Sequence, residues 1–275
     1  MTVSDSPAQL ARVEDHGDHL LIINANTKRR NALSPAFYDA IISAVTRANA
    51  APQIAALIIW GEGGFFCSGG DLTMLAARRE LSLSERASRI EHLHTVIRAI
   101  RSCRVPIIAA VDGGAAGAGL SIALACDLIV AAEDAKFTAS YVKAGLVPDG
   151  GLTHTLTRAL PHAVAMQMLL LGDSLTAERF FKVGLISELT PAGESLATAL
   201  KTTKRLCEGA GQAQVTIKAL VSKTDNAALF QQLDLERDAM AKALGAPEAG
   251  EGISAFLEKR TPDFQSVRAT LKVDQ

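Results

Sequence analysis

Two glycine-rich segments each precede a predicted helix, where backbone N–H groups stay open to a ligand. The first, Gly113–Gly119, lies between an apolar run and the helix predicted over Leu120–Cys126. Open N–H groups at a helix N-terminus can hold an anion, or an oxygen on which negative charge develops during a reaction. The second, Phe65–Leu72, contains two glycines and Asp71. Glycine there lets the backbone approach a ligand closely, and Asp71 also fits a plain helix cap.

Other interpretations of these residues stay open or fail on spacing. Gly113–Gly119 also fits an ordinary glycine-rich turn. It does not fit a dinucleotide-binding fingerprint, because Ile122 occupies the position of the third small residue. Ser121 resembles the serine of a nucleophile elbow, but its glycines precede it. A hydrolase that pairs Ser121 with His154 or His162 is therefore disfavoured.

No cysteine or histidine pair has the spacing of a metal site. We therefore expect no metal, no disulfide framework and a reduced, cytoplasmic setting. The N-terminal segment lacks the basic and apolar regions of a signal peptide. His92 and His94 alternate within a polar helical stretch, which predicts a solvated helix face. The scattered cysteines are Cys67, Cys103, Cys126 and Cys207.

Length and charge limit the class of protein. The chain has 275 residues, of which 48% are apolar and 21% charged, so it can form one large domain, with or without a small appendage. Lys and Arg total 28 against 29 Asp and Glu, a balance that gives no reason to expect nucleic acid as a partner. No apolar run reaches the roughly 18 residues of a membrane span.

The residues that could do chemistry lie between apolar strands and amphipathic helices. Ser34 and Pro35 mark a helix start, as N-cap and first helical residue, and Leu81–Arg101 reads as a further helix. A strand, a turn and a helix recur along the chain, which favours stacked ββα units in an α/β fold. The predicted strands are His19–Asn24, Ile54–Trp60, Pro106–Val111 and Asp127–Ala132.

The chain from Ser195 onward shows no convincing strand. We expect a core over residues 1–195 and a helical region over residues 196–275. The amphipathic faces of these helices must be covered by the core or by another subunit. The predicted helices are Leu196–Glu208, Gln212–Val221, Ala227–Leu244 and Gly250–Lys259.

Five collinear segments resemble the enoyl-CoA hydratase/isomerase (crotonase) superfamily. The resemblance covers roughly residues 15–265 and implies a spiral of ββα units followed by helices that build a trimer, or a hexamer of two trimers. It implies an acyl-CoA thioester as substrate, coenzyme A being part of that substrate, with no other cofactor, no nucleic acid and no membrane. The segments are Asn31–Leu33, Phe66–Leu72, Pro106–Phe137, Gly145–Gly151 and Glu251–Phe264.

The resemblance also implies where the thioester oxygen is held. By motif position, the N–H groups of Ser68 and Ala118 form the oxyanion hole, with Gly69 and Gly117 beside them in the substrate pocket. Fixed backbone dipoles in a dry pocket suit a charge that develops on one oxygen. The family commonly has glycine where Ala118 stands, and alanine keeps the donor.

Residues that face coenzyme A follow from the same motifs. Arg29 and Arg30 lie where basic residues of the family approach the nucleotide phosphates, and Asp71 and Leu72 belong to the FCSGGDL motif. Lys259 matches a lysine that in the family can reach the coenzyme A of a neighbouring subunit. For these basic residues an ordinary solvated surface is an equally good interpretation.

The chain departs from the family at the hydratase acids. Hydratases carry two glutamates, and here Ser121 and Tyr141 occupy those places in the substrate pocket. Neither serine nor tyrosine has an acid–base pKa useful near neutrality. Asp149 remains, at a place where isomerases of the family carry an aspartate. Its apolar neighbours Leu146 and Val147 should raise its pKa towards the working range.

The leading hypothesis is a double-bond isomerase in which Asp149 removes a proton from the acyl chain and returns it elsewhere. Three alternatives stand beside it. The protein could be an enoyl-CoA hydratase with atypical water activation, or an enzyme of hydrolytic or ring-opening chemistry on a cyclic acyl-CoA. It could also bind CoA thioesters without catalysis.

Overall fold

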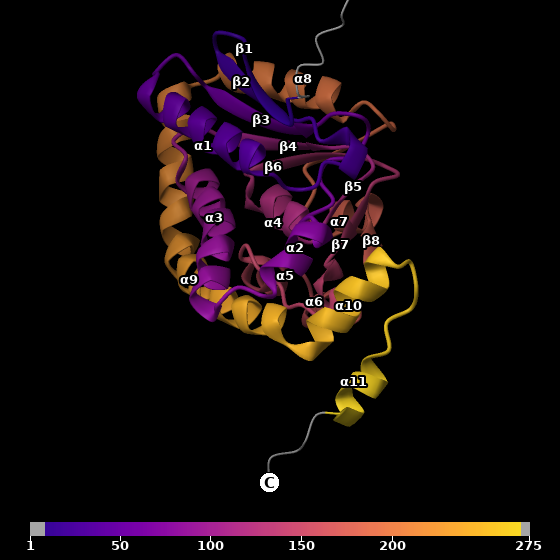
Figure 1. The fold of residues 1–275 in the computed structure, drawn as a ribbon. Coiled ribbons are helices and arrows are strands. Elements are labelled where there is room, and N and C mark those ends of the chain that lie inside the picture. Colours follow the sequence, from indigo (N-terminus) through magenta and orange to yellow (C-terminus); the bar gives the residue numbers. More distant parts are fainter. Residues whose placement is uncertain (1–8, 271–275) are drawn as a thin grey trace, which may run out of the picture.

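The computed structural model describes residues 9–270, which form two β-sheets enclosed by helices (Figure 1). The strands of the six-stranded sheet follow the order β1-β2-β3-β4-β6-β9, and those of the three-stranded sheet the order β5-β7-β8. The strands are β1 Ala11–Asp15, β2 His19–Asn24, β3 Ala56–Gly61, β4 Ile107–Val111, β5 Gly114–Ala116, β6 Leu128–Ala132, β7 Lys136–Thr138, β8 Ser174–Thr176 and β9 Glu188–Thr190.

Eleven α-helices and two short 3-10 helices connect and cover these strands in the described part of the chain. The 3-10 helices are η1 Thr27–Arg29 and η2 Ser140–Ala144. The α-helices are α1 Pro35–Ala50, α2 Leu72–Arg78, α3 Leu83–Ser102, α4 Ala118–Ala125, α5 Leu152–Ala159, α6 His162–Leu171, α7 Ala177–Lys182, α8 Ser195–Cys207, α9 Gly211–Gly245, α10 Pro247–Leu257 and α11 Phe264–Thr270.

The large sheet is parallel except for β1, which pairs antiparallel with β2. Successive side chains of its inner strands point to opposite faces, and both faces are buried. Ile59 of β3 faces the main core, whereas Ile58 and Ile108 face a second cluster that includes Ala199 of α8. The sheet is thus covered by α1 on one face and α8 on the other.

The strands that follow β4 and β6 leave the large sheet and form the small one. The chain runs from β4 through β5 into α4, and from β6 through β7 into η2. Because β5 and β7 pair in parallel, two successive ββα units stack on each other. The predicted α/β spiral of ββα units is confirmed.

The four strands predicted from apolar runs are confirmed as β2, β3, β4 and β6, with ends that differ by at most two residues. The helix start at Ser34 is also present, since the Ser34 hydroxyl accepts from the N–H of Phe37 at 3.2 Å. The remaining strands were not predicted. Four of them have only three residues, too few to show a strand period.

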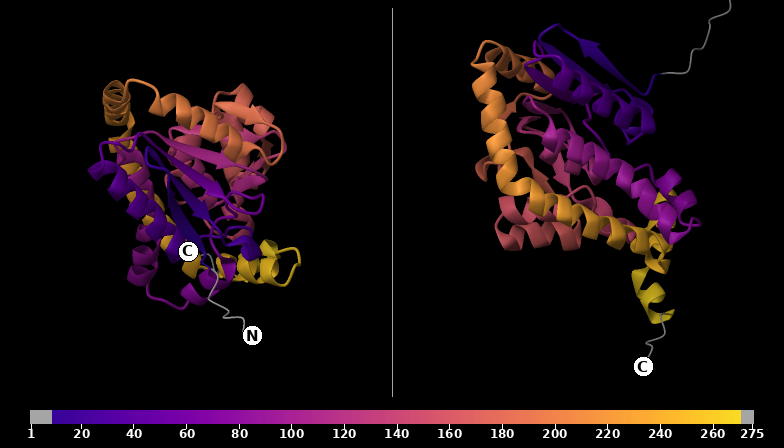
Figure 2. Two further views of the ribbon diagram at one scale, coloured as in Figure 1. Left: turned by 90° about the horizontal axis from the view of Figure 1, so that it is seen from above. Right: turned by 90° about the vertical axis from the view of Figure 1, so that its left-hand side faces the viewer.

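Two helices predicted near the C-terminus are one helix. Helix α9 runs without a break over 35 residues and packs along α3 (Figure 2). The polar stretch that separated the predicted helices contains no glycine or proline to end a helix. Its Asp225 and Asn226 instead bind Arg101 of α3, at 3.2 Å each.

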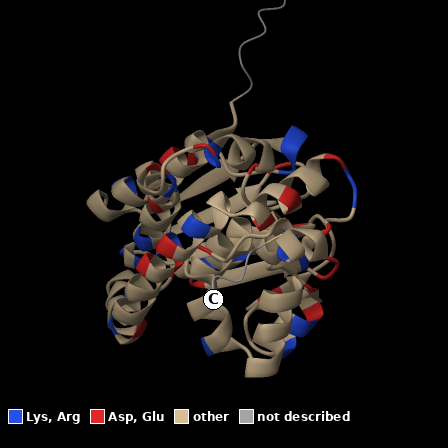
Figure 3. Cartoon of the chain, turned by 60° about the horizontal axis from the view of Figure 1, so that its bottom comes forward, with Lys and Arg blue, Asp and Glu red and all other residues tan. Residues whose placement is uncertain are grey.

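The helices after residue 195 wrap around the core. Helix α8 covers the large sheet, while α10 contacts α2 and η2. Acidic and basic residues are interspersed over the helices in Figure 3. Within residues 9–270 no helix is both long enough and apolar enough to cross a membrane.

Candidate active site

A cleft of about 900 Å³ brings most of the predicted site residues together. It is bordered by η1, α2, the N-terminus of α4, η2 and the end of α10. Of the twelve predicted site residues, all except Gly69 and Ser121 line it. Gly69 lies behind the wall, with its Cα facing the backbone of Ala116 and Ala118. The residues that line it are Arg29, Arg30, Ser68, Asp71, Leu72, Gly117, Ala118, Tyr141, Asp149 and Lys259.

Asp149 is a buried carboxyl group at the floor of this cleft, with 7% of its surface exposed. Burial raises its pKa to about 6, because the low-polarity surroundings disfavour the charged form. The Tyr141 hydroxyl donates a hydrogen bond of 2.7 Å to Asp149 Oδ1, which partly offsets that rise. One carboxylate oxygen is thereby held in place, and the group titrates where a general base is effective.

Ser121 supports the backbone of Asp149. Its hydroxyl donates to the Asp149 carbonyl oxygen at 2.9 Å and lies 3.4 Å from the Tyr141 hydroxyl. The histidine partners of a hydrolase are absent from this group. His154 binds Asp225 of α9 at 2.9 Å, and His162 is exposed. The three residues Ser121, Tyr141 and Asp149 therefore form one hydrogen-bonded cluster.

The loop after Asp149 is held from behind by two buried side chains. The N–H of Gly150 donates to His94 Nε2 at 3.1 Å. Glu236 accepts from the N–H of Gly151 at 2.6 Å and from the N–H of Thr153 at 2.9 Å. Glu236 thus satisfies the open N–H groups at the start of α5, and the loop that carries Asp149 is fixed to both α3 and α9.

The prediction that His92 and His94 share a solvated face is wrong for His94, which is fully buried, whereas His92 is exposed. Helix α3 is covered by α9, and His94 follows buried Ile90 by four positions. Burial and the charge of Arg98 lower the pKa of His94 to about 4. The imidazole is therefore neutral near pH 7, and its proton is on Nδ1 because Nε2 accepts.

Glu236 is a site residue that the sequence analysis missed. Burial raises its pKa to about 7. The available signal was its helical spacing, since Leu233 lies three positions before it and Met240 four positions after it, and both are buried. A charged residue in the middle of an apolar helix stripe indicates a buried partner.

The two predicted oxyanion donors differ in this structure. Ala118 is the first residue of α4, and its N–H meets no acceptor among the described residues. The turn that exposes it is made by Gly117, whose φ is +51°. The N–H of Ser68 donates instead to the carbonyl oxygen of Arg30 at 3.1 Å. To hold a ligand oxygen, Ser68 must share or release that bond.

The basic side chains at the cleft entrance are partly engaged. Arg29 forms an ion pair with Asp71, which also caps α2 through the N–H of Thr73 at 3.0 Å. The Arg30 guanidinium lies 4.1 Å from the ring centroid of Phe65. Lys259 lines the cleft of its own chain. The entrance thus holds cations that can approach a phosphate-bearing ligand.

One group of possible metal ligands occurs in the described part of the chain, away from the residues that line the cleft. Asp18, His19 and Cys207 bring one ligand atom each within 4.8 Å of one another. The His19 ring and the Asp18 carboxylate already form a hydrogen bond of 2.6 Å. The cleft itself is lined by the backbone N–H group of Ala118 and the carboxyl group of Asp149.

Comparison with known proteins agrees with this fold and this cleft. A model of the family described as "Enoyl-CoA hydratase/isomerase" matches residues 18–267. The chain is 32% identical to 2,3-dehydroadipyl-CoA hydratase of Escherichia coli, over 90% of this chain and 94% of the relative. It is also 32% identical to 1,2-epoxyphenylacetyl-CoA isomerase of Escherichia coli, over 86% of this chain and 91% of the relative.

Solved structures lead to the same class. An enoyl-CoA hydratase from a Polaromonas species shares 42% identity with a TM-score of 0.76, covering 92% of this chain and 98% of that one. An enoyl-CoA hydratase from Mycobacterium avium subsp. paratuberculosis shares 31% identity with a TM-score of 0.84, covering 94% and 99%. The fold and the cleft define an acyl-CoA-processing protein of the crotonase type. The chain belongs to the enoyl-CoA hydratase/isomerase family.

Proposed function

We propose that this protein is an acyl-CoA double-bond isomerase in which Asp149 is the only carboxyl group that transfers the proton. The observation that carries the proposal is the cluster at the cleft floor. It holds one buried carboxyl group with a pKa of about 6, hydrogen-bonded to Tyr141 and held through its backbone by Ser121. By the motif resemblance, Ser121 and Tyr141 take the places of the two hydratase glutamates. A single base suffices for isomerisation, whereas activating a water molecule as the family does uses two acids.

The proposed reaction moves one proton and leaves the oxidation state unchanged. Asp149 Oδ2 takes a proton from C2 of a 3-enoyl-CoA, and the electron pair of that C–H bond passes into a dienolate. The N–H of Ala118, joined by that of Ser68, stabilises the charge on the thioester oxygen. The protonated carboxyl group then returns the proton to C4, which gives the 2-enoyl-CoA. Tyr141 keeps Oδ1 engaged, so Oδ2 is left to carry the proton.

A hydratase is the second candidate, because relatives with 31–42% identity carry that name. It requires a water molecule held by Asp149 and Tyr141 in place of the two glutamates. An isomerase is also among the relatives, so the names of the relatives favour neither reaction.

A label-transfer experiment separates the two reactions. We would incubate 3-enoyl-CoA carrying deuterium at C2 with the protein in light water, and a 2-enoyl-CoA in a parallel reaction. We expect 2-enoyl-CoA with part of the deuterium at C4, and little conversion of the 2-enoyl-CoA to a 3-hydroxyacyl-CoA. Faster formation of the hydroxyacyl product than of the migrated double bond contradicts the proposal. Turnover of neither substrate, with acyl-CoA still bound, indicates ring chemistry or a binding protein.

We further propose that the protein acts as a homotrimer or a hexamer in a cytoplasmic, reducing setting. All four cysteines are free. Large apolar side chains on the outer helices are left exposed in the single chain, and burying them is favourable. The exposed residues on α6, α9 and α10 are Leu170, Leu171, Ile217, Leu220, Val221, Leu235, Phe256 and Leu257.

A further inference from the structure

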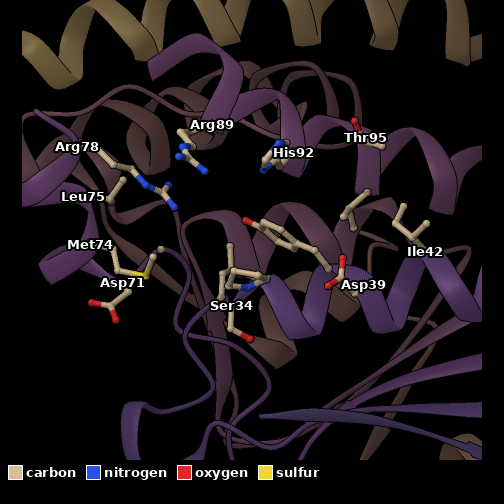
Figure 4. A pocket seen from close by; sticks show the side chains of 15 residues that line it. Ser34, Asp39, Ile42, Asp71, Met74, Leu75, Arg78, Arg89, His92 and Thr95 are labelled. Atoms are coloured by element: carbon tan, nitrogen blue, oxygen red, sulfur yellow. The ribbon is translucent and has the colours of Figure 1, made fainter. Parts of the chain in front are cut away.

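A second pocket of about 390 Å³ adjoins the cleft and lies between α1, α2 and α3 (Figure 4). Leu33, Tyr38, Leu75, Arg78 and Arg89 line both the cleft and this pocket, so the two spaces adjoin each other. An acyl chain that leads from Ala118 towards these shared residues would enter this pocket.

Most of the pocket wall is apolar, but one end carries two cations. Figure 4 shows Arg78 of α2 and Arg89 of α3 directed into the same space from neighbouring helices. Arg78 is half-buried and Arg89 is exposed. The apolar part of the wall comes from Leu33, Ile42, Met74, Leu75 and Val96.

Neither guanidinium group is held in an ion pair by the described residues. Among residues 9–270, Arg78 and Arg89 make no ion pair and no side-chain hydrogen bond. The neighbouring arginines of the same helices are engaged. Arg79 points to the carbonyl oxygen of Ala246 at 3.5 Å, and Arg86 donates to the carbonyl oxygen of Arg79 at 3.2 Å.

The acidic groups nearby are occupied or lie elsewhere. Asp71 pairs with Arg29 and caps α2. Glu85, one turn before Arg89, accepts from Ser82 at the start of α3, and its carboxylate lies within electrostatic reach of Arg89 without forming an ion pair with it. Asp39 lines the opposite end of the pocket in Figure 4, beside Ile42. Among the described residues, no carboxylate directly contacts either guanidinium group at this end of the pocket.

Tyr38 links this end to the reacting groups. Burial raises the pKa of its phenol, the charge of Asp149 raises this pKa further and the charge of Arg78 lowers it, so Tyr38 lies within electrostatic reach of both. Tyr38 lines both the cleft that holds Asp149 and the pocket that holds the two arginines.

We propose that this pocket receives the far end of the acyl chain and that this end is a carboxylate, held by Arg78 and Arg89. A guanidinium group matches a carboxylate through two parallel hydrogen bonds, and the apolar wall suits the methylene groups before it. A methyl end would leave two cations facing it without a partner. This inference rests on the proposed function only in taking an acyl-CoA as the ligand, and it holds for any reaction at the thioester.

The anion could also belong to coenzyme A, whose phosphates are attracted by the same chemistry. The two sources of the anion predict a different dependence of the affinity on the ligand. A carboxylate at the acyl end makes affinity depend on the acyl group, whereas a phosphate contact affects every CoA thioester and free coenzyme A alike. Binding of saturated thioesters distinguishes them without any turnover.

The test measures dissociation constants by calorimetry for pairs of saturated acyl-CoAs. The two members of a pair have the same chain length, from four to ten carbons, and one ends in a methyl group and the other in a carboxylate. We expect wild type to bind the carboxylate form about tenfold more tightly at one or more lengths, the usual effect of a hydrogen bond to a charged group. Arg78→Gln and Arg89→Gln should each lose most of that preference and bind the methyl form as before. Arg79→Gln, with the same loss of charge, should keep it.

Equal or weaker binding of the carboxylate form by wild type at every length overturns the inference. So does an equal loss of affinity for methyl-ended thioesters and free coenzyme A in both arginine variants, since the arginines then contact the phosphates. Both results leave the isomerase proposal standing. If wild type binds neither thioester, the inference and the proposed function fail together.

Discussion

The hydroxyl of Tyr141 lies 2.7 Å from Asp149 Oδ1 and donates a hydrogen bond to it, so the tyrosine directly contacts the proposed base. This bond favours the ionised carboxylate against the burial that raises its pKa. Tyr141 therefore influences the protonation of the neighbouring carboxyl group.

Removing the tyrosine hydroxyl should move the pH profile. With Asp149 as base and a pKa of about 6, the isomerisation rate of wild type should fall as the pH drops below about 6. Tyr141→Phe removes a donor to the carboxylate, so its pKa should rise and the acid limb of kcat/KM should shift to higher pH. Tyr38→Phe is a matched control, because Tyr38 also lines the cleft but makes no hydrogen bond to Asp149. An unchanged acid limb in Tyr141→Phe would show that the hydroxyl does not tune the base.

Neutralising the base should reduce activity. Asp149→Asn keeps the shape and removes the proton acceptor, so kcat should fall by about 10²–10⁴ while a saturated acyl-CoA still binds. Retention of most activity on 3-enoyl and dienoyl substrates would mean that another group is the base.

The same variant should be more stable than wild type at neutral pH. The folded pKa of Asp149 is raised from 3.8 to about 6, so the folded protein holds this proton more tightly than the unfolded chain does. The ionised carboxylate therefore lowers stability above pH 6, by about 1–3 kcal/mol, and this loss disappears as the pH falls towards 4. Urea unfolding of wild type and Asp149→Asn at pH 8 and pH 4 should give a gain at pH 8 alone. An equal difference at both pH values would refute burial as its cause.

The backbone donor at Ala118 should be essential to turnover. Ala118→Pro deletes the N–H, and proline is tolerated at the first position of a helix. We expect kcat to fall by about 10²–10³, the usual loss for one oxyanion donor. Ser68→Ala is the control, because it keeps the backbone donor and should change kcat little. Full activity in Ala118→Pro would remove this N–H from the mechanism.

Glu236 should act as a structural support of the loop that carries Asp149. Glu236→Ala leaves the N–H groups of buried Gly151 and half-buried Thr153 without an acceptor, which should lower the free energy of unfolding by about 1–3 kcal/mol per lost partner. Glu236→Gln keeps a carbonyl oxygen to accept from one of them and should be less destabilised. Denaturant unfolding compares the two variants, and equal losses in both would show that charge, not acceptor geometry, is what matters.

The exposed apolar side chains of the outer helices predict self-association. Light scattering at micromolar concentration should give three or six times the 28.9 kDa of one chain. Charging the outer face of α9 with Leu220→Glu should lower that mass if the face is an interface. A monomer of wild type at this concentration would contradict the proposal.

The sequence by itself determined what depends on local pattern and on collinear motifs. Apolar runs predicted the four buried strands, and the pair Ser34-Pro35 predicted the start of α1. Both signals act within a few residues, so they can be recognised without the tertiary structure. The order of the motifs identified the family. The apolar neighbours of Asp149 predicted that its pKa is raised.

Only the tertiary structure decided which residues support that carboxyl group. His94 and Glu236 lie 56 and 85 residues from the N–H groups that they bind, on helices whose buried faces are set by packing against each other. The engagement of the Ser68 N–H by Arg30, and the meeting of Arg78 with Arg89, likewise depend on how separate segments pack. Hydrogen bonds and charge pairs between distant segments leave no periodic signal in a sequence, because each partner looks locally like an ordinary polar residue.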